Sequence, residues 1–321
     1  MKISIGSLGG TISMTSKNKG EGVVPKLCAK DFIAALPDIE AELYAESLFA
    51  LPSGHLKFEM LLSALDWANT QIKNGANGVI LTQGTDTLEE SAFLCDLFWN
   101  HREPLILMGA MRDANAIGAD GIRNLYSSIL CALSPNSTER GVMVVMNDTI
   151  HTARWVRKSH SFSVNTFCSD GKTCGFISEG KVEYFYPKLK RFILPMPSVM
   201  KKVFLWEQTL DGDASVLEWV KQTQDGLVIK GFGAGHISLE TSALLDSVIE
   251  KMPVVVCTRT TDGSAAYQTY GYKGAEIDLR ERGVLMGGYL SGRKARILLW
   301  AILGNGLNME IYQDFLDTLI D

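Results

Sequence analysis

The sequence lacks any apolar stretch long enough to cross a membrane as a helix. Its longest uninterrupted apolar run, residues 297–303, falls far short of the roughly 20 residues that a spanning helix needs. It has no block of lysine and arginine, and its formal net charge is −5, so nothing indicates a nucleic acid partner. The N-terminus enters a strand-like pattern at once, without room for a signal peptide. We therefore expect a cytoplasmic protein with no membrane partner.

The six cysteines form no CxxC pair and no cluster with histidine at the spacing of a metal site. We expect reduced thiols, mostly small buried side chains, and no bound metal. Only Cys168 and Cys174 lie close enough in the sequence to suggest more. Internal repeats and low-complexity segments are also absent, and 46% of the residues are hydrophobic, which indicates a globular fold.

What the sequence does contain is an alternation of short apolar runs with longer amphipathic stretches. This βαβα pattern is typical of an α/β protein with a mostly parallel sheet flanked by helices. In the first half we expect strands at 3–5, 78–81, 104–108 and 141–146, and helices at 30–36, 57–73, 90–99 and 121–133. Parallel sheets place reactive loops at the carboxyl ends of strands, so chemistry is expected just after Ile5, Leu81, Met108 and Met146.

A length of 321 residues exceeds what one hydrophobic core usually serves, so we expect two domains. The periodicity fails between Tyr184 and Lys202, where prolines would interrupt a helix. We predict a larger N-terminal catalytic domain over 1–184, a linker over 185–201 and a smaller C-terminal α/β domain over 202–321. The C-terminal domain should contain strands at 202–206, 226–229 and 253–257, and helices at 214–222, 240–251 and 294–303.

Hydroxyl side chains gather in the first two expected loops. Thr11 follows two glycines, which allow substrate and backbone to approach closely, although such turns also occur without a function. The second loop, 82–90, contains Thr85, Asp86 and Thr87, and the last two could equally cap the following helix. Capping does not explain why several threonines and a carboxylate gather opposite Thr11. This concentration of polar side chains favours a functional site.

The third loop, from Asn147 to His160, is rich in basic side chains. A threonine hydroxyl is a poor nucleophile near neutral pH and needs a nearby base and a cation. Arg154, Arg157 and Lys158 are candidates for that cation, but such side chains by default are solvated or paired with carboxylates. The two histidines of this loop could transfer protons, although loop histidines usually have no special role.

Three blocks together, 9–12, 84–90 and 146–149, closely resemble the bacterial L-asparaginase/glutaminase family, and further blocks extend the resemblance over nearly the whole chain. The resemblance implies an amidohydrolase that converts asparagine to aspartate and ammonia through a threonine acyl-enzyme, with no cofactor. It also implies a small amino-acid amide as substrate and a homo-oligomer, a dimer or tetramer, with active sites near an intimate dimer interface. The further blocks are 109–112, 119–125 and 294–296.

The resemblance assigns roles to individual residues. Thr11 matches the nucleophile, and Thr85, Asp86 and Lys158 match the family's second threonine, its substrate-binding aspartate and its lysine. Lys158 would favour deprotonation of a threonine hydroxyl, and Asp86 would bind the substrate's α-ammonium group. Substrate binding is expected at Ser53, Gly54, Gly84 and Asp86, and backbone N–H groups around Gly84, Thr85 or Gly10 could stabilise the oxyanion.

Two departures from the family pattern leave questions open. Residues 13–27 contain no tyrosine where better-known members carry one, so Tyr267, Tyr270, Tyr272 or an aromatic residue of a neighbouring subunit could supply that hydroxyl. Ala234 stands where the family often has asparagine, so a preference for asparagine over glutamine cannot be read. The alternatives are a glutaminase, the amidase subunit of a transfer-RNA-dependent amidotransferase, which usually has an extra N-terminal domain, and a non-catalytic amino-acid sensor.

Overall fold

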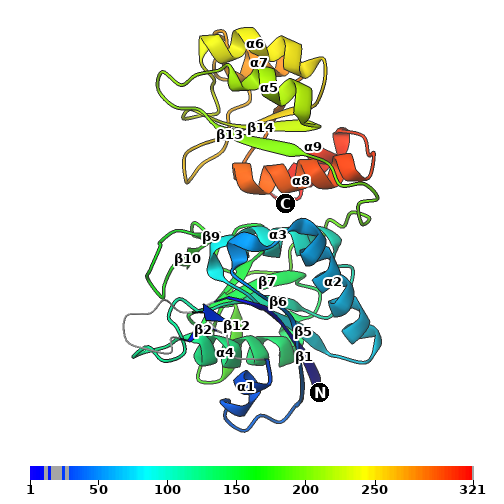
Figure 1. Cartoon of the computed structure of the whole chain (residues 1–321), viewed down its shortest axis with the longest axis vertical. Helices are drawn as coiled ribbons and strands as arrows, with labels where there is room; N and C mark the ends of the chain where they lie inside the picture. Colours follow the sequence, from blue (N-terminus) through cyan, green and yellow to red (C-terminus); the bar gives the residue numbers. More distant parts are fainter. Residues whose placement is uncertain (11–13, 16–23, 26–28, 320–321) are drawn as a thin grey trace. The chain divides into compact units, whose positions relative to one another are not determined.

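The computed structural model describes residues 1–10, 14–15, 24–25 and 29–319. The chain divides into two compact units, Met1–Ile193 and Leu194–Asp321. Each unit contains its own parallel sheet with helices packed on it (Figure 1). The expected α/β class, with a larger N-terminal and a smaller C-terminal part, is therefore confirmed.

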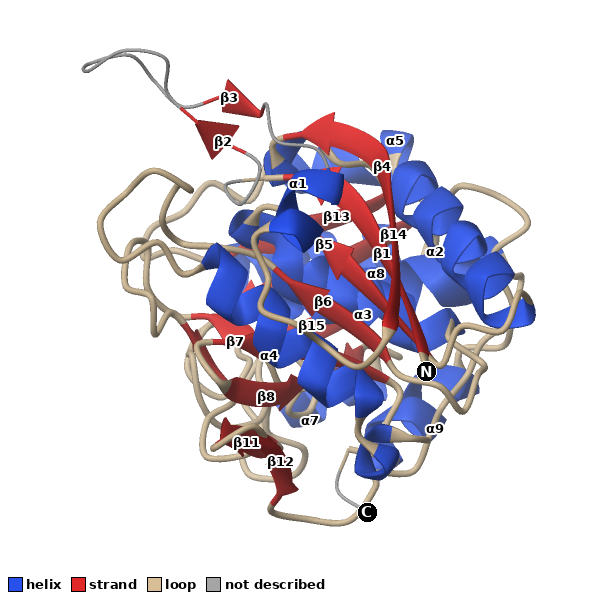
Figure 2. Cartoon of the chain, turned by 90° about the horizontal axis from the view of Figure 1, so that it is seen from below, coloured by secondary structure: helices blue, strands red, loops and turns tan. Residues whose placement is uncertain are grey.

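The larger unit is built on an eight-stranded sheet of order β12-β11-β8-β7-β6-β5-β1-β4, visible from edge to edge in Figure 2. The strands β4, β1, β5, β6 and β7 run parallel, and β8, β11 and β12 continue the sheet antiparallel. Its strands are β1 (Lys2–Gly9), β4 (Glu42–Leu51), β5 (Gly78–Thr82), β6 (Leu105–Met108), β7 (Val142–Met146), β8 (Thr149–Thr152), β11 (Gly175–Ser178) and β12 (Lys181–Tyr184). The sheet is thus mostly parallel, as predicted.

Helices cover both faces of this sheet. Figure 1 shows α2 and α3 on one face and α1 and α4 on the other. The helices are α1 (Ala29–Ala34), α2 (Phe58–Lys73), α3 (Leu88–Phe98) and α4 (Gly121–Leu133). The central strand β5 is buried along its whole length because helices cover both of its faces.

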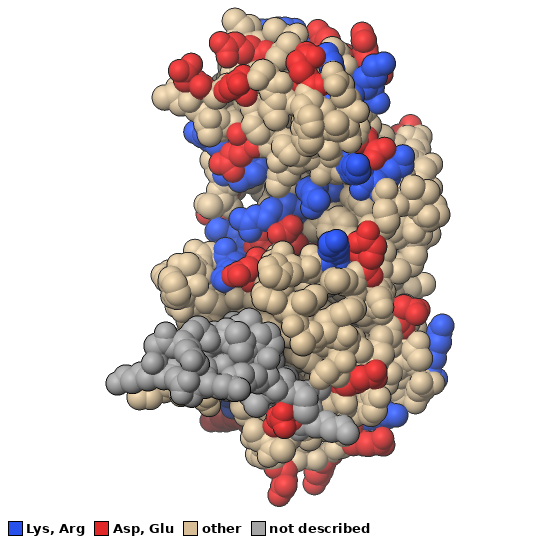
Figure 3. Space-filling model, in the orientation of Figure 1, with Lys and Arg blue, Asp and Glu red and all other residues tan. Residues whose placement is uncertain are grey.

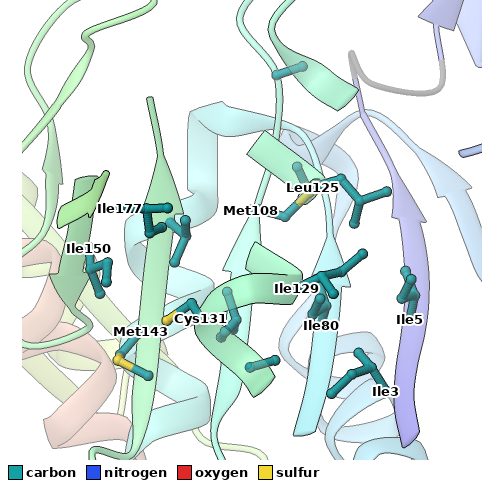
Figure 4. Close-up of a cluster of buried hydrophobic side chains, with 14 of the residues drawn as sticks. Ile3, Ile5, Ile80, Met108, Leu125, Ile129, Cys131, Met143, Ile150 and Ile177 are labelled. Atoms are coloured by element: carbon teal, nitrogen blue, oxygen red, sulfur yellow. The ribbon is translucent and has the colours of Figure 1, made fainter. Parts of the chain in front are cut away.

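The helix α4 shows how the sequence pattern produces the core. Leu125, Ile129 and Ala132 recur at helical spacing and are buried against the strands. Figure 4 shows Ile129 next to Ile80 of β5 and Leu125 next to Met108 of β6, and Ile3 and Ile5 of β1 lie in the same cluster. Burying side chains of this size stabilises the fold by about 1.5–3 kcal/mol each, so this face of the sheet is firmly fixed.

The structure corrects three expectations near the strand ends. The first strand does not stop at Ile5 but continues to Gly9. The segment Glu42–Leu51, for which no strand was expected, forms β4 and pairs in parallel with β1. Residues 147–160 are not one loop, because β7 and β8 form an antiparallel hairpin, and β9 (Arg157–Lys158) pairs with β10 (Phe167–Cys168). Asn147 and Asp148 have φ of 50° and 56°, which suits a tight hairpin turn.

The smaller unit has a four-stranded parallel sheet of order β13-β14-β15-β16. Its strands are β13 (Val203–Glu207), β14 (Gly226–Gly231), β15 (Val254–Thr258) and β16 (Leu285–Met286). Its helices are α5 (Val216–Thr223), α6 (Leu239–Ile249), α7 (Glu276–Glu281), α8 (Gly292–Gly304) and α9 (Glu310–Asp317). The predicted elements are present, while α7, α9 and β16 had no counterpart in the prediction.

The structure also bears on the predictions about membrane-spanning helices, cysteines and surface charge. Among the described residues, no helix is both long and apolar enough to span a membrane. Five of the cysteines are described, all with free thiols, and all but Cys168 are buried. Acidic and basic side chains lie next to one another on the face shown in Figure 3, which agrees with the mixed charge pattern of the sequence.

Candidate active site

Close backbone packing joins the end of β1 to the loop after β5. The two strands pair in parallel, with Ser7 opposite Thr82. Gly10 follows β1 with φ of 88°, and a Cβ atom on it would lie 2.1 Å from the backbone nitrogen of Gly84. Only glycine fits this conformation and this space. The chain leading to Thr11 therefore starts against Gly84, while Thr11 itself lies outside the described residues.

Ser53 also lies next to Gly84. It begins a short 3-10 helix, Ser53–His55, directly after β4, and it is buried. A Cβ atom on Gly84 would lie 2.8 Å from Ser53 Oγ, so these two predicted site residues are in contact. Gly54 is exposed, and a Cβ atom there would meet no atom within 4 Å. The structure thus brings Ser53 to the site and leaves open space next to Gly54.

Lys158 joins Thr85 and Asp86. Its Nζ atom donates to Thr85 Oγ1 at 2.9 Å and to Asp86 Oδ1 at 2.6 Å. Thr85 is buried, whereas 77% of the Asp86 side chain is exposed. Because the lysine uses one lone pair of Oγ1, the hydroxyl hydrogen of Thr85 can be donated to another acceptor. Three residues predicted from two separate loops therefore form one polar cluster.

The capping alternative for this loop is not realised. Residues Thr85–Thr87 form a short 3-10 helix that leads into α3, and the N-cap residue Thr87 makes no side-chain capping bond. Instead, Thr87 Oγ1 donates to the carbonyl of Ser53 at 3.1 Å. The hydroxyl thus ties the loop after β5 to the turn after β4, which fixes Ser53 beside Gly84.

Glu89 holds the backbone of Lys158. Its carboxylate is buried in the first turn of α3, and Oε2 accepts the Lys158 backbone N–H at 2.5 Å. A hydrogen bond to a buried carboxylate is stronger than one between neutral groups. Glu89 belongs to one of the family blocks, but the sequence alone assigned it no role; its spacing of four residues after Thr85 was the available signal.

The remaining candidates of the third loop have structural roles. Arg154 is buried, with Nε 3.4 Å from Asp96 Oδ2, and Arg157 Nε donates to Asp170 Oδ1 at 2.8 Å. His151 is buried, and its Nδ1 lies 2.8 Å from the hydroxyl of Ser169. His160 Nδ1 accepts two backbone N–H groups at 3.0 Å each. Lys158, by contrast, contacts Thr85 and Asp86.

A hydrogen-bond network that was not predicted from the sequence surrounds Gly109, where a Cβ atom would lie 3.0 Å from Thr85 Cγ2. Asp120 accepts the backbone N–H groups of Met111 and Arg112, and Asn124 Nδ2 donates to the carbonyl of Gly109 at 3.0 Å. Asn124 Oδ1 accepts the N–H of Asn147 at 2.9 Å. These residues belong to the family blocks after β6, at the start of α4 and after β7. The structure shows that the blocks contact one another.

The arrangement of the cluster suits acyl transfer. Within the described ranges, no group of three or more His, Cys, Asp or Glu side chains is placed to hold a metal ion. A buried hydroxyl bound by an ammonium group is suited to proton transfer around a carbonyl carbon. The exposed carboxylate of Asp86 next to it can bind a cationic group of a small ligand.

Comparison with known proteins gives consistent matches along the chain. Residues 2–190 match the family model "Asparaginase, N-terminal", and residues 202–316 match "Glutaminase/Asparaginase C-terminal domain". An L-asparaginase of Bacillus licheniformis is 28% identical, over 95% of this chain and 96% of the relative. L-asparaginase 2-3 of Saccharomyces cerevisiae is 30% identical, over 96% of this chain and 87% of the relative.

A solved structure extends the likeness to the fold. The crystal structure of a probable cytoplasmic L-asparaginase from Campylobacter jejuni superimposes with a TM-score of 0.89 and 28% sequence identity. The match covers 98% of this chain and 99% of that structure. Both units therefore have counterparts in one known protein.

Proposed function

Because the chain belongs to the asparaginase family, we propose that it is an L-asparaginase that hydrolyses the side-chain amide of L-asparagine to L-aspartate and ammonia. The family resemblance predicted from the sequence motifs is confirmed by these matches. The observation that carries the catalytic proposal is the contact of Lys158 Nζ with both Thr85 Oγ1 and Asp86 Oδ1. It places a cation, a hydroxyl and a carboxylate at the carboxyl end of β5.

The proposed nucleophile is the hydroxyl of Thr11. Its oxygen attacks the side-chain amide carbon of asparagine, the C–N bond breaks, and ammonia leaves with the proton that the hydroxyl has lost. Water then hydrolyses the resulting ester and restores the threonine. The packing of Gly10 against Gly84 supports this proposal, because the segment leading to Thr11 starts beside the Thr85 cluster.

Thr85 and Lys158 form the proposed proton relay. The ammonium group of Lys158 favours a negative charge on a neighbouring oxygen, which lowers the cost of moving a proton away from a threonine hydroxyl. Thr85 can pass that proton towards the leaving amine, since its own hydrogen is directed away from the lysine. Backbone N–H groups near Gly84 would stabilise the oxyanion, each contributing about 3 kcal/mol in comparable hydrolases.

Asp86, Ser53, Gly54 and Gly84 are the proposed substrate-binding residues. The Asp86 carboxylate is mostly exposed and can accept hydrogen bonds from the α-ammonium of a free amino acid. Ser53 contacts Gly84, and the open space next to Gly54 leaves room for the backbone groups of a small substrate. This set favours a free amino-acid amide over an asparagine within a peptide chain, because the α-nitrogen of an internal residue is an uncharged amide.

A glutaminase is the second candidate, because the description of the C-terminal family model names both activities. The test is release of ammonia from L-asparagine, L-glutamine and D-asparagine under identical conditions. We expect L-asparagine to give the highest kcat/KM. Higher turnover of L-glutamine would support the second candidate, and no ammonia from any of them would overturn both.

We further propose a cytoplasmic homo-oligomer, a dimer or tetramer. The family resemblance supports the oligomer, and the likeness to the Campylobacter jejuni protein, a probable cytoplasmic L-asparaginase, supports the location. Light scattering on the purified protein tests the first point, and a single-chain mass would contradict it. Cell fractionation tests the second.

A further inference from the structure

A hydrogen-bonded chain of three side chains lies in the smaller unit. The hydroxyl of Tyr272 is 2.6 Å from His236 Nδ1, and His236 Nε2 is 3.2 Å from Glu276 Oε2. The other carboxylate oxygen, Oε1, accepts the backbone N–H groups of Thr269 and Tyr270 at 2.6 Å each. A hydroxyl, an imidazole and a carboxylate in this order form the arrangement by which hydrolases activate a nucleophile.

Glu276 determines which imidazole nitrogen carries the proton. The carboxylate is fully buried. Burial raises the pKa of Glu276, but hydrogen bonds from backbone N–H groups and from His236 outweigh burial and lower it overall. An ionised carboxylate only accepts hydrogen bonds, so His236 must donate from Nε2. The lone pair of Nδ1 in the neutral imidazole then faces the hydroxyl of Tyr272 and can accept its proton.

Tyr272 is the exposed end of this chain. The residue is 54% exposed, while only 15% of the His236 side chain is. Burial of part of the ring and the charge of Glu276 raise the pKa of Tyr272, so its phenol keeps its proton at neutral pH. A neutral phenol is a weak nucleophile unless a base removes its proton during the attack, and His236 lies within hydrogen-bond distance to do so.

The neighbouring tyrosines are arranged differently. The hydroxyl of Tyr267 donates to the carbonyl of Met286 at 3.2 Å, so it is used inside the fold. Tyr270 contacts His236 through the edge of its ring, at 4.9 Å between centroids, and is 44% exposed. Tyr270 is therefore about as exposed to solvent as Tyr272. It contacts the imidazole through its ring and not through a hydrogen bond of its hydroxyl. It is an internal control for Tyr272.

We propose that Tyr272 is a second nucleophile of this protein, activated by His236 and Glu276, and that it accepts acyl groups from small activated esters. In the step, the phenolic oxygen forms a bond to the acyl carbon while its proton moves to His236 Nδ1. The bond between the acyl carbon and the ester oxygen breaks, and the alcohol portion of the ester leaves as an alkoxide or phenolate anion. Glu276 stabilises the imidazolium that forms.

The test uses p-nitrophenyl acetate with full-length protein carrying Thr11→Ala, which removes the proposed nucleophile of the amidase reaction. Release of p-nitrophenolate is followed, and the acetyl group is located by mass spectrometry of peptides. We expect acetylation of Tyr272 in preference to Tyr270. The Thr11→Ala background keeps this outcome separate from the amidase proposal.

Variants of the base and of its partner complete the experiment. His236→Gln should slow acetylation of Tyr272 by about a hundredfold, the usual contribution of a general base. Glu276→Gln should also slow it, and Tyr270→Phe should not; thermal unfolding confirms that each variant is folded. Equal acetylation of Tyr270 and Tyr272, or an unchanged rate in folded His236→Gln, would overturn the proposal.

Discussion

The backbone N–H of Lys158 donates to the buried carboxylate of Glu89 at 2.5 Å, although 69 positions separate the two residues. The ammonium group of the same lysine contacts Thr85 and Asp86, which belong to the segment leading into Glu89. Both ends of Lys158 are therefore held by residues 85–89. This double attachment, at the backbone and at the ammonium group, positions the lysine.

Glu89→Gln should lower activity without unfolding the protein. The amide keeps an acceptor for the Lys158 N–H but loses the charge, which weakens such a bond by about 1 kcal/mol. We expect kcat to fall about fivefold if that loss appears in the transition state, with a smaller change in KM. Glu90→Gln, next to it and partly exposed, is the matched control. Equal effects of both variants would contradict a positioning role.

Thr11→Ala and Thr85→Ala should each abolish ammonia release. Removing a nucleophile or a relay member from a hydrolase typically costs about 10⁴-fold or more in kcat. Steady-state assays with L-asparagine measure the loss, and circular dichroism shows whether the fold persists. Thr87→Ser, which keeps the hydroxyl bonded to Ser53, should retain activity. A fully active Thr11→Ala would refute the proposed nucleophile.

Lys158→Met should reduce activity and change its pH dependence, because an ammonium group beside Thr85 is replaced by an uncharged chain of similar length. The pH profile of kcat/KM is the measurement. Lys188→Met serves as control, since Lys188 pairs with Glu139 at 2.9 Å, outside the cluster. An unchanged profile in Lys158→Met would remove the lysine from the relay.

Gly10→Ala should destabilise the protein and abolish activity. The new Cβ atom would lie 2.1 Å from Gly84 N, and φ at Gly10 is 88°. Gly75 has nearly the same φ, 87°, but a Cβ atom there would meet no atom within 4 Å, so Gly75→Ala isolates the backbone cost of about 1 kcal/mol. Urea unfolding compares the two. Equal losses in both variants would mean that the contact with Gly84 is unimportant.

Asp278 should make stability depend on acid pH. Burial raises its pKa, but hydrogen bonds from the Gly274 N–H, Lys273 and Arg282 outweigh burial and lower it overall. A carboxyl with a lowered folded pKa stabilises the fold above its unfolded pKa of about 3.9, and this contribution is lost as the pH falls through the folded value. Asp278→Asn should therefore destabilise the fold at pH 7, and on acidification it should lose less stability than the parent protein loses.

Urea unfolding at neutral and acid pH measures this difference. Glu281→Gln, an exposed position on the same helix, is the control and should retain the pH dependence of the parent protein. If Asp278→Asn retains the full loss of stability on acidification, the carboxyl of Asp278 does not contribute to it.

The central strands and helices of the larger unit could be predicted because each has a clear hydrophobic pattern, either a continuous apolar run or apolar residues at helical spacing. The strand Gly78–Thr82 is apolar and fully buried, and α4 has the predicted bounds, with Ser134 and Pro135 after it. By contrast, Glu42–Leu51 mixes polar and apolar side chains and is mostly half-exposed, because it forms an edge of the sheet. This segment becomes a strand by pairing with β1, which is distant in the sequence. Its local pattern therefore did not indicate a strand.

The sequence by itself determined the α/β class and the family, and it supplied the proposed site residues, because motif spacing and hydrophobic periodicity are local properties. It also indicated that the side chains of Thr85, Asp86 and Lys158 are chemically suitable for proton transfer and substrate binding. Only the tertiary structure decided that the lysine contacts the other two and that Glu89 holds its backbone. Such contacts join strands far apart in the chain, and their geometry follows from sheet register and packing, which no local pattern specifies.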